Sequence, residues 1–200
     1  LMVSTIPDPR TSRYRYVIGG LTLWAHFAAG LNFQAVSPLL PLITKDYGLN
    51  NTAGSLLVAL VLVIVAAFGL PGGILVGRLG LRRVYTVSWL MIGLLTLSAL
   101  SPTFGGLLPL RIIYGLGMAM IMPATGPLIM GWFWPKEMPV IASLNIAAMS
   151  LGIMVSTSTA VPLAEHLGWD RTLGVFGAVG LAGFVAWLIW GRVGVASPGL

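Results

Sequence analysis

The stretch "GGILVGRLGLRR", residues 72–83, separates two apolar segments and decides how the chain is read. An uncharged apolar run ends at Arg78, two more arginines follow at Arg82 and Arg83, and a second apolar run begins at Val84. Three arginines within six residues are unusual in a chain in which only 8% of the residues are charged. Short basic loops between apolar runs are typical of the cytoplasmic side of membrane proteins. The stretch therefore predicts a basic loop between two membrane-spanning helices.

The composition indicates an integral membrane protein. Hydrophobic residues make up 57% of the 200 residues, and the mean hydropathy is +0.94. A soluble domain has about 25% charged residues, so this chain has too few to cover a water-exposed surface. The net charge of +6 does not indicate nucleic-acid binding, because most basic residues lie between apolar runs rather than along one face. The absence of cysteine from the sequence excludes thiolate metal ligands and a cysteine nucleophile.

Six apolar runs are long enough to cross a bilayer, which takes about 20 helical residues. The region 84–135 contains one charge, Arg111, and is more than twice as long as one span, so it must fold back. Proline and glycine in "SPTFGG", residues 101–106, favour a turn there. A β-barrel would show shorter segments of alternating polarity. We therefore predict an all-α integral membrane protein with six transmembrane helices, at about 17–41, 53–77, 84–101, 107–131, 138–164 and 172–191.

The basic residues gather on one side of this predicted bundle. Six spans place both ends of the chain on the same side, together with Arg10, Arg13, Arg15, Arg78, Arg82, Arg83, Lys136 and Arg192. The opposite side has Lys45 and Arg171. Positive residues accumulate in short cytoplasmic loops, so we expect a multi-pass protein of the cell membrane with both ends of this chain in the cytoplasm. Residues 1–16 are then a cytoplasmic tail, 17–191 the bundle, and 192–200 the start of a central cytoplasmic linker.

Small residues form stripes on three predicted helices. Such stripes let helix backbones approach closely in lipid. They serve either static packing or surfaces that slide between two states, and the sequence leaves both alternatives open. The stripes are Gly69, Gly73 and Gly77; Ala148, Gly152, Ser156 and Ala160; and Gly174, Gly177, Gly180 and Gly183.

Two motifs resemble those of the major facilitator superfamily. The loop pattern of that family reads roughly Gly-x-Leu-Ala-Asp-Arg-x-Gly-Arg-Lys-x, and this chain matches it at Gly73, Leu75, Arg78, Gly80 and Arg82. It departs from the pattern at Gly77, where the family usually has Asp, and at Leu81. The family's fourth-helix pattern, Arg-x-x-x-Gly-x-Gly-x-Ala, is similar to Arg111, Gly115, Gly117 and Ala119. Weaker similarities occur in "SPLLPLI" at 37–43 and "GWDR" at 168–171.

The resemblance implies a secondary transporter that works by alternating access. Transporters of this family have two six-helix halves with the substrate site near the bilayer midplane, and this chain resembles the N-terminal half. The implied partners are the lipid bilayer, a small-molecule substrate and a C-terminal six-helix half. Proton coupling is left open between a symporter and a facilitator, because no Asp or Glu lies within a predicted span. We expect no cofactor and no metal site.

The departure at Gly77 bears on gating. In the family this Asp is thought to steady the outward-open state through contacts with the other half, which glycine cannot do. We therefore expect the conformational lock either to be weaker in this chain or to be made elsewhere, by Arg82 or Arg83 pairing with Glu137 of the other cytoplasmic loop.

Polar residues within the spans are the candidate site residues. A charge in a span costs about 2.5–3.5 kcal/mol on insertion scales, so Arg111 either reaches to the outer interface or lines the cavity and meets an anionic group. Tyr114 shares its helix face. In the first helix, Asn32 and Gln34 point about 160° apart and cannot line one cavity unless the helix is broken. The resemblance implies that helices 1 and 4 line the cavity, which adds both to the candidates.

Two further polar residues are weaker candidates. A histidine side chain ordinarily titrates near neutral pH, so His26 would suit proton coupling. Asn145 lies in the predicted fifth helix. Both are alternatively explained by a polar network that joins helices.

A six-helix intramembrane enzyme or a scaffold is the alternative class. The sequence has no Gly-x-Ser-x-Gly motif, and the two histidines, His26 and His166, lie in a helix and an outer loop. All acidic residues lie in loops or in the tail: Asp8, Asp46, Glu137, Glu165 and Asp170. We therefore expect a transporter rather than an enzyme. A small anion such as nitrate, cyanate or a carboxylate fits Arg111, and a neutral substrate remains the alternative.

Overall fold

The computed structural model describes residues 9–100 and 103–194, which are helical throughout apart from short turns. Six units in this part are long and apolar enough to cross a membrane, which confirms the predicted fold class. Three predicted features lie wholly or partly outside the described residues: the tail at 1–8, the linker at 195–200, and positions 101–102 of the predicted turn. The elements are η1 (Pro9–Thr11), α1 (Arg15–Gln34), α2 (Val36–Tyr47), α3 (Asn51–Leu79), α4 (Leu81–Gly93), η2 (Leu94–Leu100), α5 (Phe104–Met130), α6 (Met138–Leu167) and α7 (Trp169–Trp190).

The first span consists of α1 and α2, with an interruption at Ala35. Pro38 explains the interruption, because it has no N–H to donate to the carbonyl of Gln34 and its ring crowds that carbonyl. The span continues to Tyr47, beyond the predicted end at residue 41. It ends at Gly48, whose left-handed conformation (φ +63°) is typical of a helix C-terminus.

Two connections between spans consist of a single glycine. Gly80 joins α3 to α4 with φ +83° and ψ 144°, and Gly168 joins α6 to α7 with φ +87° and ψ 154°. A residue with a Cβ is strained in this region of backbone conformation. Gly80 of the loop motif therefore permits a sharp reversal between two spans. The "GWDR" stretch supplies an equivalent reversal.

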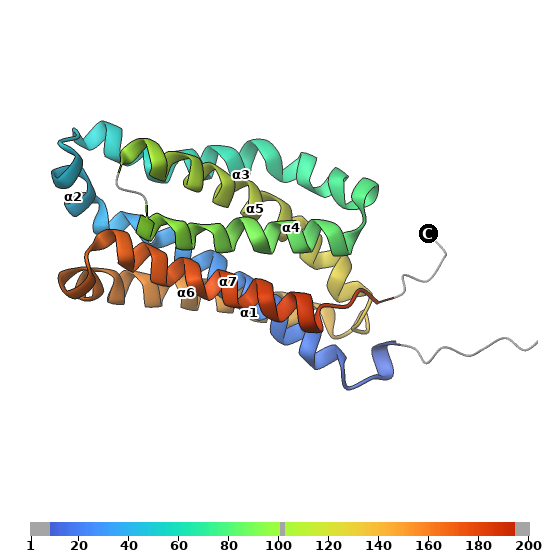
Figure 1. Cartoon of the computed structure of the whole chain (residues 1–200). Coiled ribbons are helices and arrows are strands. Elements are labelled where there is room, and N and C mark those ends of the chain that lie inside the picture. Colours follow the sequence, from blue (N-terminus) through green and yellow to red (C-terminus); the bar gives the residue numbers. More distant parts are fainter. Residues whose placement is uncertain (1–8, 101–102, 195–200) are drawn as a thin grey trace, which may run out of the picture.

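The six spans form two groups of three that pack with the same pattern. In one group, α3 and α4 pack on α5. In the other group, α6 and α7 pack on α1 (Figure 1). The two groups also meet where α4 and η2 run along α7. Exchanging α1, α3 and α4 with α5, α6 and α7 in this description preserves the contacts, and the Gly80 turn is then replaced by the Gly168 turn at the other end of the bundle. This is the inverted-repeat arrangement of many transporter halves.

Two of the three small-residue stripes pack inside the bundle. A Cβ at Gly177 would clash with the backbone of Leu95 and Thr96, and a Cβ at Gly152 would clash with the carbonyl of Phe27. The stripe on α3 differs, because a Cβ at Gly69 would meet no atom within 4 Å. Gly77 is equally open. The α7 and α6 stripes therefore bring backbones together, whereas much of the α3 stripe faces away from the bundle.

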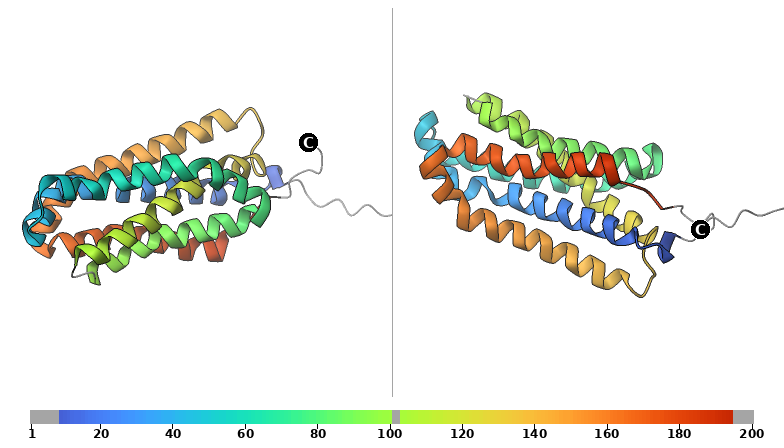
Figure 2. Two further views of the ribbon diagram at one scale, coloured as in Figure 1. Left: turned by 90° about the horizontal axis from the view of Figure 1, so that it is seen from above. Right: turned by 60° about the horizontal axis from the view of Figure 1, so that its bottom comes forward.

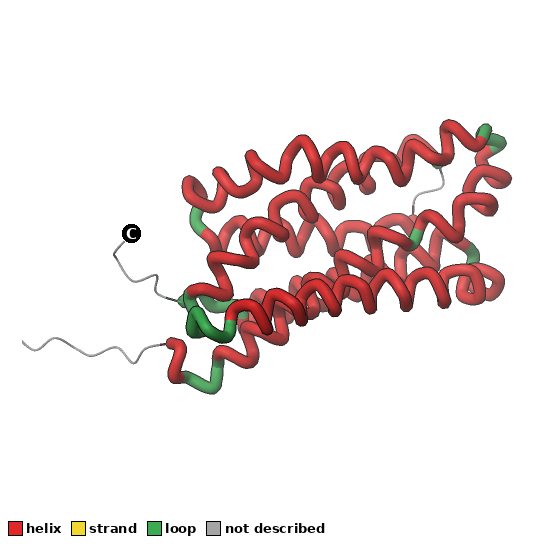
Figure 3. Tube along the Cα trace, turned by 180° about the vertical axis from the view of Figure 1, so that it is seen from behind, coloured by secondary structure: helices red, strands yellow, loops and turns green. Residues whose placement is uncertain are grey.

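The span α3 lies along the upper edge of the bundle in Figure 1, and α6 lies along an outer edge in both views of Figure 2. Only 22% of the most apolar window of α3 and 11% of that of α6 are buried, against 44–56% for the other four spans. The start of α1, the end of α7 and the connections α3–α4 and α5–α6 lie together at one end (Figure 3). The basic residues predicted for one side, as far as they are described, therefore share that end of the molecule.

Candidate functional site

Arg111 on α5 is enclosed by the bundle and only 1% exposed. Its Nη1 donates a hydrogen bond to the backbone carbonyl of Asn32 at 2.9 Å, and its guanidinium carbon lies 5.8 Å from the ring centre of Tyr114. Its Nε and Nη2 have no hydrogen-bond partner. Of the two alternatives for this residue, the structure shows the buried one, because the side chain does not reach the surface.

The interruption of α1 explains how a cation can be buried here. The carbonyl that Arg111 contacts lies in the last turn of α1, which ends at Gln34. The C-terminal carbonyls of a helix carry a partial negative charge that favours a nearby cation. Within the described residues, the recorded ion pair joins Arg15 to Glu137, so no carboxylate neutralises Arg111. The partial negative charge at the end of α1 compensates part of the positive charge of Arg111.

The neighbours of Arg111 divide into those that contact it and those that do not. Tyr114 lies beside it, and its hydroxyl donates to the carbonyl of Ala29 at 2.6 Å. The Asn32 side chain instead donates to the carbonyls of Ala28 at 2.9 Å and Phe176 at 3.0 Å, so it joins α1 to α7. Gln34 is half-buried and makes no hydrogen bond to Arg111. The site therefore consists of Arg111, Tyr114 and the backbone of α1.

The glycines of the fourth-helix motif lie where α5 meets its neighbours. A Cβ at Gly115 would come within 3.2 Å of Ile64 on α3. A Cβ at Gly117 would lie 3.0 Å from the carbonyl of Ser88 on α4. These contacts hold α5 between α3 and α4 and fix the orientation that directs Arg111 towards α1.

His26 on α1 and Asn145 on α6 are both buried within the bundle. His26 is 7% exposed, and its Nδ1 lies 2.9 Å from the carbonyl of Thr22. Asn145 is 3% exposed, and neither its Oδ1 nor its Nδ2 has a hydrogen-bond partner. Neither side chain bonds to Arg111, so neither belongs to the Arg111 site.

The predicted contact between the cytoplasmic loops is wrong. Glu137 pairs with Arg15 at 3.1 Å and also accepts the backbone N–H of Trp134 at 3.0 Å. Arg82 and Arg83 are exposed and form no ion pair with any described residue. The reason is tertiary: α1 and α6 pack side by side, so Arg15 and Glu137 start neighbouring spans. The sequence offered a signal for this pair, since both residues directly border apolar runs.

Gly73 and Arg78 of the loop motif lie on the last turns of α3. A Cβ at Gly73 would be 3.7 Å from Pro123 of α5, which is ordinary contact. Arg78 is exposed near the Gly80 turn. Gly80 of the loop motif therefore acts through its backbone conformation. The three arginines of the motif, Arg78, Arg82 and Arg83, are exposed on the surface of the bundle.

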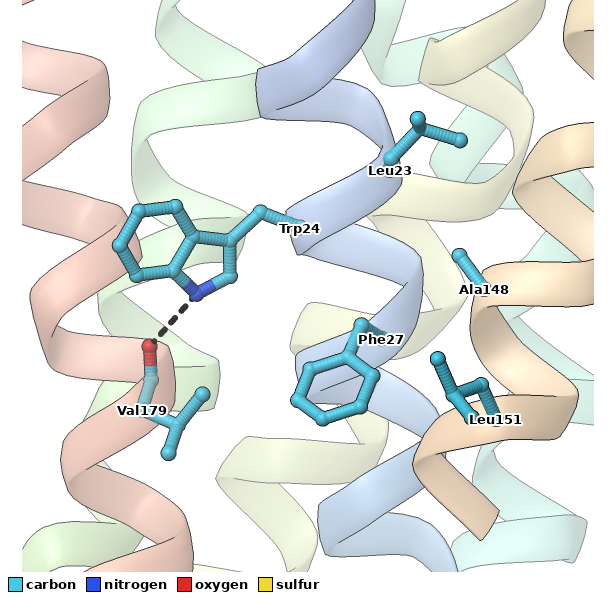
Figure 4. A pocket seen from close by; sticks show the side chains of 6 residues that line it. All are labelled: Leu23, Trp24, Phe27, Ala148, Leu151 and Val179. Carbon is cyan, nitrogen blue, oxygen red and sulfur yellow. Dashed lines mark hydrogen bonds between the residues drawn. The ribbon is translucent and has the colours of Figure 1, made fainter. Parts of the chain in front are cut away.

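A large apolar pocket lies between α1, α6 and α7, apart from Arg111 (Figure 4). Its volume is about 500 Å³. The indole N–H of Trp24 donates to the carbonyl of Val179 at 3.1 Å and is not free for a ligand. The pocket therefore suits hydrocarbon rather than a charged solute. Its lining residues are Leu23, Trp24, Phe27, Ala148, Leu151 and Val179.

The profile of the Major Facilitator Superfamily matches residues 22–198, and the chain belongs to this family. Members of the family are typically membrane transporters rather than enzymes. This assignment agrees with the six spans, the inverted repeat and the glycine turn of the loop motif. The protein is therefore a multi-pass membrane protein of the transporter class.

Individual relatives share a quarter or more of the aligned residues. The uncharacterized MFS-type transporter YybF of Bacillus subtilis is 29% identical over 83% of this chain and 42% of its own length. The 4-hydroxybenzoate transporter PcaK of Pseudomonas aeruginosa is 25% identical over 81% of the chain and 36% of its own length. Human vesicular glutamate transporter 2 is 26% identical over 60% of the chain and 21% of its own length. The chain thus spans about half or less of the relatives it matches.

Proposed function

We propose that this chain is one six-helix half of a secondary transporter that moves a small organic or inorganic anion by alternating access. The observation that carries the proposal is Arg111, a buried guanidinium whose Nε and Nη2 have no partner. These two nitrogens lie on one edge of the guanidinium, so their parallel N–H bonds match the two oxygens of a carboxylate. An anion at this edge would satisfy both donors and the buried charge.

The relatives support an anionic substrate by their names. Glutamate and 4-hydroxybenzoate both carry a carboxylate, and the transporters named for them match 60% and 81% of this chain. The shared chemistry is the negative group rather than the rest of either molecule. We therefore propose a carboxylate or a comparable small anion as the substrate.

In this proposal each candidate residue has a stated role. Arg111 binds the anion, Tyr114 positions the guanidinium, and Gly115 and Gly117 hold α5 in place. Gln34 lies one residue before the interruption of α1, where a change of helix direction would move it relative to the anion. The Asn32 side chain supports the site by fixing α1 to α7.

The exposed edges of the bundle support a second half. Without that half, α3 and α6 have the least buried spans, and the α3 stripe has no neighbour at Gly69 and Gly77. Small residues on a span are typical of helix–helix contacts rather than of lipid contacts. We propose that a C-terminal six-helix unit packs against these edges in the cell membrane, and that both ends of this chain are cytoplasmic.

The proposal is tested by substituting Arg111 in the full-length protein reconstituted into liposomes. A hydrogen bond to a charged group contributes about 1.5–3 kcal/mol, so Arg111→Gln should lower the uptake of 4-hydroxybenzoate or glutamate about 10- to 100-fold. Arg111→Lys keeps the charge but loses the paired donors, and should retain intermediate uptake.

The matched control is Lys45→Gln, which removes an exposed cation at the end of α2 and should leave uptake unchanged. Equal amounts of inserted protein must be compared, because Arg111 also contacts the backbone of α1. Uptake of both anions by Arg111→Gln at the level of the unsubstituted protein would refute the anion site.

A further inference from the structure

The apolar pocket of Figure 4 and a second, more polar pocket lie along the same pair of helices. The second pocket has a volume of about 340 Å³ and lies where α1 and α6 begin. In the apolar pocket, Figure 4 shows α1 between α6 and α7. Arg111 lines neither pocket. The second pocket is lined by Tyr16, Phe133, Lys136, Glu137, Val140 and Ile141.

Helical spacing places the two pockets on one continuous face of α1 and one continuous face of α6. On α1, Tyr16 of the second pocket is followed after 7 and 11 residues by Leu23 and Phe27 of the apolar pocket. On α6, Ile141 of the second pocket is followed after 7 residues by Ala148 of the apolar pocket. Side chains spaced by 3, 4, 7 or 11 residues share one side of a helix. The two pockets are therefore the two ends of one groove.

The groove runs from the basic end of the bundle towards its middle. The helices α1 and α6 run in the same direction, since Arg15 and Glu137 pair at their starts and Gly30 packs against the backbone of Met149 further along. Gly20 lies four residues after the polar end, on the same face of α1, and a Cβ there would meet no atom within 4 Å. No side chain therefore closes the groove at Gly20, between the two pockets.

The polar end of the groove can hold a phosphate group. Glu137 pairs with Arg15, so its charge is compensated, whereas Lys136 takes no part in the ion pair recorded for the described residues. The Tyr16 hydroxyl accepts a hydrogen bond from Arg15 Nη2 at 2.8 Å, which leaves its own O–H to donate. An ammonium and a hydroxyl donor thus line the same pocket. Together they complement the charge and the oxygens of a phosphate.

The length of the groove matches one lipid chain. Phe27 lies eleven residues after Tyr16, or about 16 Å along α1. One leaflet supplies half of a hydrocarbon core about 30 Å thick. Tyrosine and tryptophan are enriched at the membrane–water interface, and the exposed Tyr16 and Trp134 are placed to mark that level. A phospholipid with its phosphate beside Tyr16 therefore reaches Phe27 with an acyl chain.

We propose that this groove binds one anionic phospholipid, with its phosphate at Lys136 and Tyr16 and one acyl chain that extends to Phe27. The inference does not depend on the proposed anion transport. The charge at this end of the bundle favours an anionic headgroup over a zwitterionic one, because the described acidic residue there is Glu137. The described basic residues at the same end are Arg10, Arg13, Arg15, Arg78, Arg82, Arg83, Lys136 and Arg192.

Native mass spectrometry of the delipidated full-length protein, titrated with phosphatidylglycerol, measures the affinity of the polar end. Lys136→Gln should weaken binding about fivefold, the usual effect of one basic residue near an anionic headgroup. Lys45→Gln, which removes an exposed lysine at the end of α2, is the matched control and should not change the affinity. Phosphatidylcholine with the same chains should bind more weakly. Equal affinities for the two lipids, or an unchanged affinity in Lys136→Gln, would overturn the proposal.

A second pair of variants tests the apolar part of the groove. Gly20→Trp places an indole between the two pockets and should weaken the binding of both lipids at least about tenfold, because two methylene groups kept from the groove already account for that loss. Leu97→Trp on η2 is the control, since Leu97 is exposed and lines neither pocket. Equal affinities in Gly20→Trp and Leu97→Trp would contradict binding in the groove.

Photochemical cross-linking locates the acyl chain in liposomes. A phosphatidylglycerol with a diazirine at the end of one chain should label residues 23–27 and 148–151 of the full-length protein. Labelling spread evenly over all spans would show bulk lipid only. Labelling absent from these segments, together with a disulfide between a cysteine at position 20 and the second half, would show that this half covers the groove. Either result would overturn the lipid site.

Discussion

Gly80 shows how one residue of the loop motif acts through backbone conformation alone. Its φ of +83° lies where a Cβ is strained, and a Cβ built there would touch no neighbouring atom. The cost of another residue at this position is therefore conformational and not steric. The motif requires glycine because two spans reverse direction around one residue.

We predict that Gly80→Ala lowers the free energy of unfolding by about 1–3 kcal/mol, the usual cost of a strained backbone position. Gly168→Ala should have a similar effect, since its φ is +87°. Gly20→Ala, in the interior of α1 with no atom within 4 Å of a Cβ, is the control and should not destabilise the protein. Denaturant titration of the purified protein, followed by tryptophan fluorescence, measures all three; equal midpoints for Gly80→Ala and Gly20→Ala would contradict the argument.

At the residue scale, the sequence singled out Arg111 but could not place it. Arg111 is the one charged residue among the 52 residues of the region 84–135, and its cost in lipid marks it as functional. Whether it reaches the interface or lies inside depends on the direction of α5, which is set by contacts of Gly115 and Gly117 with other spans. Its partner is a backbone carbonyl of α1, for which no side-chain pattern exists.

Among the elements, α1 shows how a local signal and a distant contact combine. Pro38 interrupts the helix for a local reason. The sequence analysis did not predict the interruption; it stated only that Asn32 and Gln34 could line one cavity if the helix were broken. In the structure the interruption supplies the helix end that receives Arg111. The position of Asn32 could not be predicted, because its side-chain acceptors include the carbonyl of Phe176, 144 residues away in sequence.

The small-residue stripe on α3 leads to a prediction about where the proposed C-terminal six-helix half packs. Gly69 lies half-buried on α3 and its face has no neighbour in the described residues, so we expect a helix of another unit to cover it. Gly69→Trp should disturb that contact and lower anion uptake by the full-length protein. Gly20→Trp, at an exposed position of α1, should leave uptake unchanged if that face meets lipid.

Chemical cross-linking gives the physical readout for the same variants. A cysteine at position 69 should form a disulfide with a suitable cysteine of the second unit, whereas one at position 20 should not. The contact proposed for α3 would be refuted if Gly69→Trp left uptake intact and no cysteine of a second unit could be linked to position 69.

For the whole molecule, we predict that the two ends of the bundle lie on opposite sides of the membrane, with the more basic end in the cytoplasm. Arg82 lies in the first turn of α4, at the end that gathers most of the described basic residues, and Arg171 lies in the first turn of α7, which starts at the opposite end. The sequence has no cysteine of its own, so a single introduced cysteine in this chain is readily followed. In intact cells, Arg171→Cys should react with a membrane-impermeant maleimide. Arg82→Cys should react only after the cells are opened, and the reverse pattern would invert the proposed orientation.

The inverted repeat is a property of the whole molecule that the sequence analysis did not detect. Gly80 with Arg83 and Gly168 with Arg171 share the spacing Gly-x-x-Arg, but the rest of the two groups of spans was not recognised as a repeat. The repeat becomes visible in which helix packs on which. Packing of this kind depends on shape and small residues, which very different sequences can provide.

The sequence by itself determined the class of protein, the six spans and the breaks between them. These features arise from hydrophobicity summed over about 20 neighbouring residues and from backbone preferences of single residues, both of which are local. The tertiary structure alone decided that Glu137 pairs with Arg15, that Arg111 meets the end of α1, and that Asn32 joins α1 to α7. Each of these depends on which spans are neighbours and in what register, and side chains far apart in the sequence set that register only when the bundle packs.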